Sequence, residues 1–245
     1  MLKYIIPFLY THRYNRKGIE SIAYVLEYYV ALALFVMLSC NNIDSVFIYL
    51  VSLTAFMLVY EIGYIENNVV AIEKESSPTI RHQRDELVYI KDNLKMIYMS
   101  RYLLSFGLVV GLSFYIDVTY LVASLVVTRG VYYLYNIKYR TGTFNRTLFV
   151  TLRLLRYFAP ISFLGLVSLI AVLPIVVVNI INNYAWYDRS KVHFPRFFGT
   201  KLFDAIAYGM FFLLFKFLNY DSIAYLFLYL TVIKLVLFVA VLIKR

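Results

Sequence analysis

Charged residues are scarce in this chain of 245 residues: they make up 16% of it, whereas 62% of the residues are apolar. Soluble domains contain about 25% charged residues, so this composition excludes an ordinary soluble globule and indicates a polytopic helical membrane protein. Cys40 is the only cysteine, which excludes an internal disulfide and a thiolate-rich metal site. The three histidines (His12, His82 and His193) are far apart in the sequence, so no histidine-based metal centre is indicated either.

Long apolar runs, in contrast, are abundant. Since a membrane-spanning helix needs about 20 predominantly apolar residues, hydropathy predicts about eight spans. They lie near residues 21–38, 45–65, 94–115, 118–136, 146–160, 164–182, 202–218 and 222–243. The fifth and sixth are separated only around Pro160 to Gly165, where a tight re-entry is expected. We therefore predict an all-α integral membrane protein forming a single polytopic domain over residues 1–245.

Lysine and arginine are confined to alternate connections between these spans. The connections around Ser39–Asp44, Asp117, Ile161–Leu164 and Asn219–Asp221 contain neither residue, whereas the other connections and both ends of the chain are basic. This sorting follows the positive-inside rule for an even number of spans, so both termini are expected in the cytoplasm, most simply at a bacterial inner (plasma) membrane. It also accounts for the net charge of +10, and no nucleic-acid partner is expected.

The two longest basic connections, near 66–93 and 183–201, follow the second and the sixth span. When the two halves of the chain are overlaid, Pro78 falls on Pro195 and Lys74 on Lys191. We therefore expect an interfacial arm over 1–20 and two four-helix halves, 21–140 and 141–245, around a central cavity open to the cytoplasm. The alternative is that any chain of eight helices can be folded over in this way.

Acidic and amide side chains stand at the end of the second span, and basic residues follow them. Glu61, Glu66 and Asn68 precede Lys74 and Arg81. Carboxylate and amide oxygens are suitable Mg²⁺ ligands, and lysine or arginine can hold the phosphate groups that Mg²⁺ often accompanies. Taken alone, this segment could equally be a solvated loop.

A second polar segment follows the sixth span. Asn179, Asn183 and Asp188 precede Arg189 and Lys191, and a proline comes next at position 195. Because a solvated loop has no reason to recur at the equivalent place, the repetition favours a binding site formed by both segments.

These segments give the chain a resemblance to the UbiA superfamily of intramembrane prenyltransferases. That family has one aspartate-rich run after its second helix and another after its sixth. Here Glu61, Glu66 and Asn68, with Lys74 and Pro78 downstream, stand at the first place. At the second place, Asp188–Arg189, Phe194–Pro195 and Phe198–Gly199 match the family's Asp-Arg, Leu-Pro and Leu-Gly.

A third stretch is similar to the family's connection between its fourth and fifth helices. It contains Tyr135, Lys138, Arg140 and Thr141, with Pro160 and Gly165 beyond. Together the three stretches cover most of residues 60–199.

The resemblance implies an eight-helix UbiA-like fold and an Mg²⁺-dependent enzyme that acts on a diphosphate substrate and a polyprenyl lipid. It implies Glu61, Glu66 and Asp188 as catalytic metal ligands, with Asn68 as a further ligand. It also implies a substrate-binding set of Lys74, Arg81, Lys138, Arg140, Arg189, Lys191, Asn68, Asn179 and Asn183.

Departures from the family pattern leave the activity open. Glutamate replaces aspartate at position 61, and asparagines replace acids in both runs, so the metal site has less negative charge. The first reading is prenyl transfer from a polyprenyl diphosphate to an acceptor. The alternatives are phosphoribosyl transfer to polyprenyl phosphate in cell-envelope polysaccharide synthesis, a non-catalytic lipid-binding subunit, or a small transporter. The oligomeric state, the acceptor and the lipid chain length are not predicted.

Charged residues also occur within the apolar spans, where each is expected to face a polar cavity, form a pair or extend to the interface. We expect Arg129, Arg153 and Arg156 to extend the anion site. We expect Lys216 and Lys234 to extend to an interface, and Glu27 and Asp204 to pair with arginines.

Overall fold

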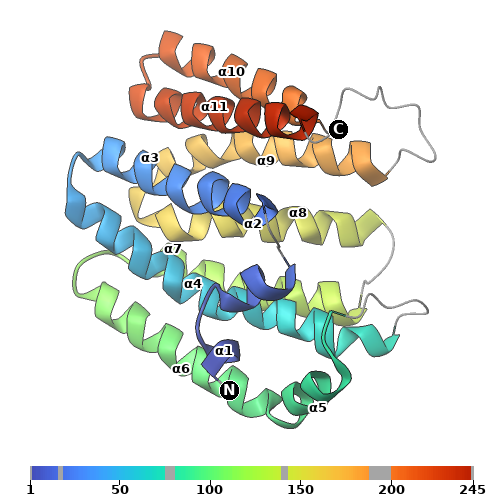
Figure 1. Cartoon of the computed structure of the whole chain (residues 1–245). Helices are drawn as coiled ribbons and strands as arrows, with labels where there is room; N and C mark the ends of the chain where they lie inside the picture. Colours follow the sequence, from blue (N-terminus) through green and yellow to red (C-terminus); the bar gives the residue numbers. More distant parts are fainter. Residues whose placement is uncertain (1, 16–18, 75–80, 139–142, 188–199, 244–245) are drawn as a thin grey trace. The chain divides into compact units, whose positions relative to one another are not determined.

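The computed structural model describes residues 2–15, 19–74, 81–138, 143–187 and 200–243 (Figure 1). Over these ranges the chain is helical apart from short connections, and it contains no strand. The predicted all-α class is therefore confirmed. The helices form two compact units, Met1–Ser21 with Ile48–Phe163 and Ile22–Phe47 with Leu164–Arg245, which we describe separately as the first and second unit.

The first unit begins with an amino-terminal arm, which we define as residues 2–15. The arm contains α1 (Leu2–Ile5) and η1 (Thr11–Asn15). The remaining elements are α4 (Ile43–Val69), η3 (Ala71–Lys74), α5 (Arg84–Asp92), α6 (Leu94–Ser113), α7 (Thr119–Tyr133), η4 (Leu134–Lys138), α8 (Thr143–Phe158) and η5 (Ala159–Leu164). Tyr4 and Tyr10 of the arm are fully buried in one apolar cluster with Ile65, Ile90 and Ile97. This cluster fixes the arm against α4, α5 and α6.

The second unit is built around a helical hairpin. Its elements are α2 (Ile19–Tyr24), η2 (Val25–Val30), α3 (Ala31–Cys40), α9 (Leu166–Tyr187), α10 (Lys201–Phe217) and α11 (Asp221–Ile243). Helices α10 and α11 lie side by side, and α3 packs against α11 (Figure 1). Stacked and tilted aromatic pairs join the hairpin, among them Phe215 with Phe227 at 5.5 Å between ring centroids.

Three tight turns have a left-handed residue. Asn41 (φ 49°) joins α3 to α4, Asn219 (φ 61°) joins α10 to α11, and Gly165 (φ 63°) joins η5 to α9. Asparagine and glycine tolerate this conformation better than other residues. The re-entry predicted around Pro160 to Gly165 is therefore present, with a short 3₁₀ helix leading into the turn.

Five helical stretches in the described ranges are long and apolar enough to cross a membrane. They are Ser21–Cys40, Ile43–Glu73, Leu94–Ser113, Phe144–Leu164 and Asp221–Ala240. The remaining three predicted spans coincide with α7, α9 and α10 and are not among these five; the described part of α9, Leu166–Asn182, is a shorter apolar helix. Large apolar side chains such as Phe106 and Phe217 are exposed on these helices, as expected of surfaces that face lipid.

The two units do not coincide with the predicted halves 21–140 and 141–245. The helices of residues 22–40 group with α9, α10 and α11, whereas α8 groups with α4, α6 and α7. The physical reason is pairing: α3 packs along α11, and α8 packs against α7. The predicted central cavity and eight-span UbiA-like arrangement stay predictions.

Candidate functional site

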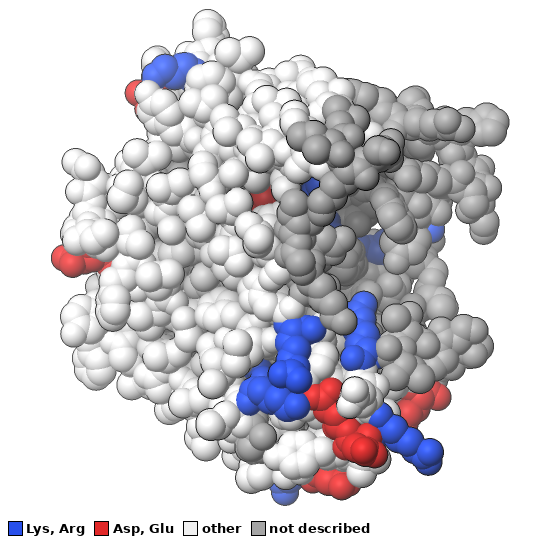
Figure 2. Space-filling view, viewed as in Figure 1, with Lys and Arg blue, Asp and Glu red and all other residues white. Residues whose placement is uncertain are grey.

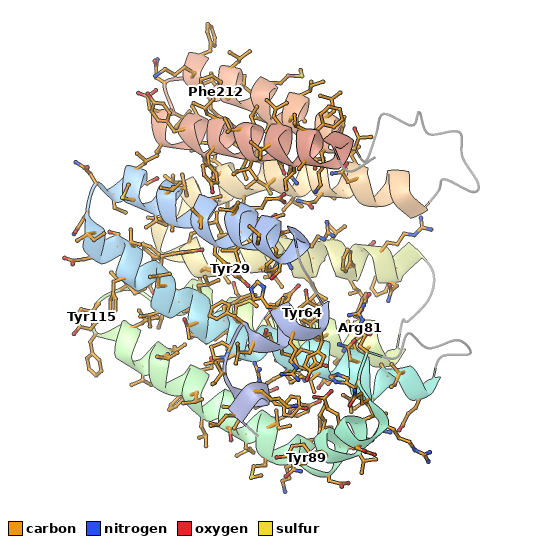
Figure 3. All side chains as sticks on the ribbon, in the orientation of Figure 1. Tyr29, Tyr64, Arg81, Tyr89, Tyr115 and Phe212 are labelled. Carbon is orange, nitrogen blue, oxygen red and sulfur yellow. The ribbon has the colours of Figure 1, made fainter. Side chains whose placement is uncertain are left out.

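The charged side chains of the first unit gather at one end. Figure 2 shows lysine, arginine, aspartate and glutamate together on the surface where α5 lies. In Figure 3, Arg81 lies at this end of the unit and Tyr115, just after α6, lies at the other. The carboxyl-terminal end of α4, which carries the first predicted motif, belongs to this polar end.

Arg101, on α6, is the largest fully buried side chain among the described residues. Its Nε donates to the carbonyl oxygen of Tyr4 at 2.6 Å, and its Nη1 donates to that of Leu58 at 3.1 Å. Its Nη2 donates to the carboxylate of Glu61 at 3.1 Å and to the carbonyl oxygen of Ile6 at 3.5 Å. A guanidinium has five N–H donors in a rigid planar arrangement, so a single side chain can bind the irregular arm to two helices.

Glu61 completes this arrangement from the other side. Its Oε1 accepts from the backbone N–H of Thr11 at 2.8 Å, and its Oε2 accepts from that of Phe8 at 3.1 Å. Phe8 has a φ of 70°, a strained conformation for a residue with a side chain, which these hydrogen bonds stabilise. Because Glu61 is fully buried and both of its oxygens have donors, its geometry supports a structural role and not the predicted role as an Mg²⁺ ligand.

Glu66 lies one and a half turns further along α4 and is partly exposed. Its two oxygens accept from Arg129 of α7, at 2.6 and 3.2 Å. The arginine thereby joins the end of α4 to α7, and its predicted part in an anion site stays a prediction. The pair is a two-point guanidinium–carboxylate contact, the strongest geometry for such groups.

Asn68 and Arg81 complete the described part of the first motif. Asn68 is buried, and its Nδ2 donates to the hydroxyl of Tyr10 at 3.1 Å. Arg81 is exposed just before α5. Asn68 therefore faces the interior of the polar end, and Arg81 faces its surface.

An aromatic cluster lies beneath this end, between α4 and α7. Tyr132 contacts Tyr60 edge to face, at 5.2 Å between ring centroids, and Tyr60 contacts Tyr64 in the same way. The ring of Tyr132 lies directly over Gly63, where an added Cβ would approach it to 2.2 Å. Asn136 donates to the carbonyl oxygen of Gly63 at 3.1 Å. The sequence Tyr-x-x-Gly-Tyr thus permits close packing of α4 against α7.

Arg156 of α8 reaches the same cluster. Its Nη1 donates to the hydroxyl of Tyr64 at 3.4 Å, and its guanidinium lies 5.8 Å from the ring centroid of Tyr60. Arg153 stacks instead on Phe149 of its own helix, at 4.6 Å. Arg156 is therefore the arginine of this helix that is buried beside the end of α4.

Glu86 of α5 is the charged centre of the arm's docking site. Its Oε1 accepts from Lys3, Tyr4 and Tyr14, each at 2.5 or 2.6 Å. Its Oε2 lies 3.3 Å from Nδ1 of His82. Burial alone would raise the pKa of Glu86, but these four donors hold it below its ordinary value. Glu86 is thus a carboxylate throughout the physiological range.

The second unit has its own buried ionic cluster. Nζ of Lys234, on α11, lies 2.8 Å from Glu27 of η2 and 3.0 Å from Asp204 of α10. Nδ2 of Asn182, on α9, donates to Asp204 at 2.5 Å, and Lys201 lies 3.9 Å from Glu27. Four helical elements are therefore joined by one lysine and its two carboxylates.

This cluster corrects two predictions. Lys234 does not extend to an interface, because only 7% of its side chain is exposed. Among the described residues, Glu27 and Asp204 pair with this lysine and not with the predicted arginines. Lys216, in contrast, is exposed and pairs with Asp221 at 2.7 Å at the α10–α11 turn.

Several predicted site residues cannot be placed in the site. Asp188, Arg189, Lys191 and Arg140 lie outside the described residues, and Lys74, Lys138 and Asn183 are described only as backbone positions. Asn179 belongs to the second unit, where its Nδ2 donates to the carbonyl oxygen of Ile175 in its own helix. The predicted convergence of Glu61 with Asp188 stays a prediction.

The described residues do not by themselves fit an Mg²⁺ ion. No group of three or more histidine, cysteine, aspartate or glutamate side chains occurs among them in an arrangement that could hold a metal. Glu61 is enclosed by the arm, and both oxygens of Glu66 contact Arg129. Magnesium binding therefore stays a prediction that depends on residues beyond the described ranges.

Sequence reasoning missed the role of the arm. Tyr4, Tyr10 and Tyr14 read as part of a general aromatic excess, and His82 read as an isolated histidine. The available signal was the i, i+4 spacing of His82 and Glu86, which places both side chains on the same side of a helical turn.

Comparisons with known proteins found no matching family model, no similar curated protein and no similar solved structure.

Proposed function

We propose that this protein is a UbiA-like intramembrane transferase that binds a diphosphate substrate and a polyprenyl lipid at the polar end of the first unit. The lipid would lie along the apolar helices, and the diphosphate would lie at the end of α4. The eight-span arrangement, the cytoplasmic orientation and the magnesium dependence are parts of the same proposal.

The observation that carries the proposal is the grouping at this end of α4. Near this end of α4, where a predicted span ends, Glu66 pairs with Arg129 of α7 and Asn68 bonds to Tyr10 of the arm, and exposed Arg81 lies just before α5. Charged groups within or beside a span are costly unless they serve a site or a pair. Here they coincide with the motif that carries the family resemblance.

The chain's own residues have distinct parts in this proposal. Arg81 attracts and contacts the anionic headgroup from the surface, because its side chain is exposed. Arg129 supplies a second positive charge that Glu66 keeps in place, and Asn68 holds Tyr10 of the arm against the end of α4. Tyr60, Tyr64 and Tyr132 form an aromatic floor beneath the headgroup.

A second candidate is a non-catalytic lipid-binding membrane subunit. The specific observation that favours it is the state of the two carboxylates: Glu61 is enclosed, and Glu66 is in a two-point contact with Arg129. A protein that only holds a lipid headgroup needs the arginines but no metal ligands.

Both candidates can be tested with the purified full chain in lipid nanodiscs. Binding of a radiolabelled prenyl diphosphate would be measured with and without Mg²⁺. Turnover would be measured in two arms, prenyl diphosphate with candidate acceptors, and phosphoribosyl diphosphate with polyprenyl phosphate. The informative variant is Arg81→Gln, and Arg84→Gln is its matched control because Arg84 is also exposed and lies three residues away.

We expect Arg81→Gln to weaken binding about tenfold, the loss of one charge-assisted contact, and Arg84→Gln to bind like the wild type. Turnover in either arm supports the transferase and identifies its donor. Binding without turnover in both arms supports the lipid-binding subunit. Absence of binding by the wild-type protein contradicts both.

A further inference from the structure

The buried ionic cluster of the second unit contains two carboxylates but one buried cation. The side chains of Glu27, Asp204 and Lys234 are 12%, 6% and 7% exposed, and each lies in a predicted membrane span. Among the described residues, the other cation in contact with the cluster is Lys201, whose side chain is 44% exposed. Two carboxylates and one ammonium give the buried part a formal charge of −1, which is costly inside an apolar span unless it is neutralised.

The two carboxylates are not equally satisfied. Both oxygens of Asp204 have a partner, because Oδ2 lies 3.0 Å from Nζ of Lys234 and Oδ1 accepts from Asn182 at 2.5 Å. Oε2 of Glu27 accepts from Lys234 at 2.8 Å, whereas Oε1 is buried and has no hydrogen-bond donor among the described residues. A buried polar atom without a partner is costly, so Oε1 of Glu27 is the atom at which this cluster can bind a proton.

Lys201 is only loosely attached to this oxygen. Its Nζ lies 3.9 Å from Oε1 of Glu27, which is within the range of an ion pair but too far for a hydrogen bond. Lys201 also faces Lys234, and the two ammonium groups repel each other. Because its side chain is half exposed and has a flexible stem, Lys201 can turn from the cluster to the surface without a change in the backbone.

The buried charge can therefore be balanced in two ways. Either Lys201 stays beside Glu27 as a second cation, or Glu27 binds a proton at Oε1. A protonated Glu27 is neutral, which leaves Lys234 and Asp204 as a one-to-one pair. The two states compete, since each of them neutralises the same carboxylate.

We infer that Oε1 of Glu27 is a proton-binding site coupled to Lys201: uptake of a proton releases Lys201 to the surface, and pairing of Lys201 with Glu27 expels the proton. A hydronium ion supplies the proton, the new O–H bond forms at Oε1, and a water molecule is left. By linkage, removal of Lys201 from the cluster must strengthen proton binding by the same factor as proton binding weakens the hold on Lys201. These residues all belong to the second unit, so the inference does not rest on the proposed function.

Among the described groups of the cluster, Glu27 is the one with an open position for a proton. The charged and titratable groups around it are Lys201, Asp204 and Tyr208 of α10 and Lys234 of α11, and Tyr208 in turn faces Tyr28 of η2. Tyrosine hydroxyls stay protonated below about pH 9. Lys234 bridges two carboxylates and both oxygens of Asp204 have partners, so neither group offers the position that Oε1 of Glu27 offers.

The test uses the full chain in lipid nanodiscs and compares Lys201→Gln with Lys216→Gln. Both variants remove a half-exposed lysine of α10, but Lys216 pairs with Asp221 at the other end of the helix. The first readout is the infrared C=O band of a protonated carboxyl group, followed from about pH 5 to pH 9 and assigned with Glu27→Gln. The second is the labelling of Lys201 by an amine-reactive reagent, measured by mass spectrometry relative to Lys216 in the same molecules.

We expect a C=O band that depends on Glu27 and grows as the pH falls. Over the same range, the labelling of Lys201 relative to Lys216 should rise about fivefold, which corresponds to the loss of one partly exposed ion pair. In Glu27→Gln this ratio should be high at every pH. Lys201→Gln should make Glu27 bind its proton more tightly by a similar factor, whereas Lys216→Gln should titrate like the wild type.

The absence of a Glu27-dependent band throughout this range, or a labelling ratio that does not change with pH, overturns the inference. Equal effects of Lys201→Gln and Lys216→Gln on the band also overturn it, because Glu27 is then not coupled to Lys201. Lys201→Gln changes a half-exposed side chain, so this comparison can be made even if Glu27→Gln does not fold. None of these measurements uses a diphosphate, so their failure is distinct from a failure of the proposed function.

Discussion

Each unit buries an ionic cluster, but the two clusters have different structural roles. In the first unit, Arg101 directs three donors to backbone carbonyls or Glu61 around an irregular arm. In the second unit, Lys234 lies between the carboxylates of two regular helical elements. An arginine can serve many acceptors in fixed directions, whereas a lysine is a compact charge that bridges two partners. The first cluster therefore organises the backbone of the arm, and the second holds helices together.

The largest effect should come from Arg101→Met. It leaves Glu61 as an unpaired buried charge and removes the donors that hold the arm. We expect a loss of about 3–5 kcal/mol in the free energy of unfolding, measured as a lower thermal midpoint of the purified protein, and faster cleavage of the arm by trypsin. The double variant Arg101→Met, Glu61→Leu should recover part of the stability. An unchanged midpoint and a protected arm would show that the cluster does not organise backbone.

Lys234→Met should have the next largest effect. It leaves Glu27 and Asp204 buried without their shared cation, and we expect a loss of about 3 kcal/mol, limited because one carboxyl group can take up a proton. The same thermal measurement applies. Adding Asp204→Asn should restore stability, while the arm should stay resistant to trypsin in both variants. If Lys234→Met made the arm sensitive to trypsin, the arm would depend on both clusters and not on the Arg101 cluster alone.

Gly63→Ala tests whether the first unit depends on close helix packing as well as on its ion pair. The added Cβ would meet the ring of Tyr132, so we expect a loss of about 2 kcal/mol from overpacking. Gly130→Ala is the matched control, since a Cβ there meets nothing within 4 Å. Circular dichroism melting of both variants in the same detergent gives the comparison. Equal melting temperatures of the two variants would show that close packing at Gly63 does not stabilise the first unit.

Acidification should lower the stability of the first unit by a smaller amount than these substitutions. Burial lowers the pKa of His82 and of His12, so between that lowered value and about 6.5 the unfolded chain binds more protons than the folded one. Stability present above pH 6.5 is therefore lost as the pH falls, by less than about 1 kcal/mol from His82. Hydrogen exchange of the arm at pH 7.5 and 5.5 measures this effect. His82→Gln should flatten it, and an arm that exchanges faster at pH 7.5 would reverse the expected sign.

Lys216→Ala should have no measurable effect on thermal stability. Its contact with Asp221 is exposed and screened by solvent, in contrast to the buried contacts of Lys234 in the same unit. A clear drop in the melting temperature would show that exposure is a poor guide to the value of an ion pair here.

The positions of many helices and turns could be predicted, because they depend on the hydropathy and turn preferences of residues that are close in the sequence. The helices of residues 43–69 and 221–243 follow from apolar runs, and the turn at Gly165 follows from glycine after a proline-containing segment. The grouping of the helices of residues 22–40 with α11 depends on partners two hundred residues apart, such as Glu27 and Lys234. No local pattern encodes that choice.

The candidate site was predictable only in part, for a related reason. The motif identified Glu61, Glu66 and Asn68, but a side chain's role depends on what lies against it. Glu61 is one turn and a half from Glu66 on the same helix, yet the arm encloses the first and not the second. A contact made by backbone N–H groups carries no side-chain signature, so the sequence could not separate a metal ligand from a structural carboxylate.

The hydrogen bonds that Arg101 and Glu61 form with the arm have a consequence for folding during synthesis of the chain. Residues 4–11 leave the ribosome well before Arg101, which is 97 positions after Tyr4, and before α6 can enter the bilayer. Until then the arm has no guanidinium to satisfy its carbonyl groups, and Glu61 has no cation. Docking of the arm must therefore wait for a helix that is synthesised later, so the arm reaches its final position late in assembly.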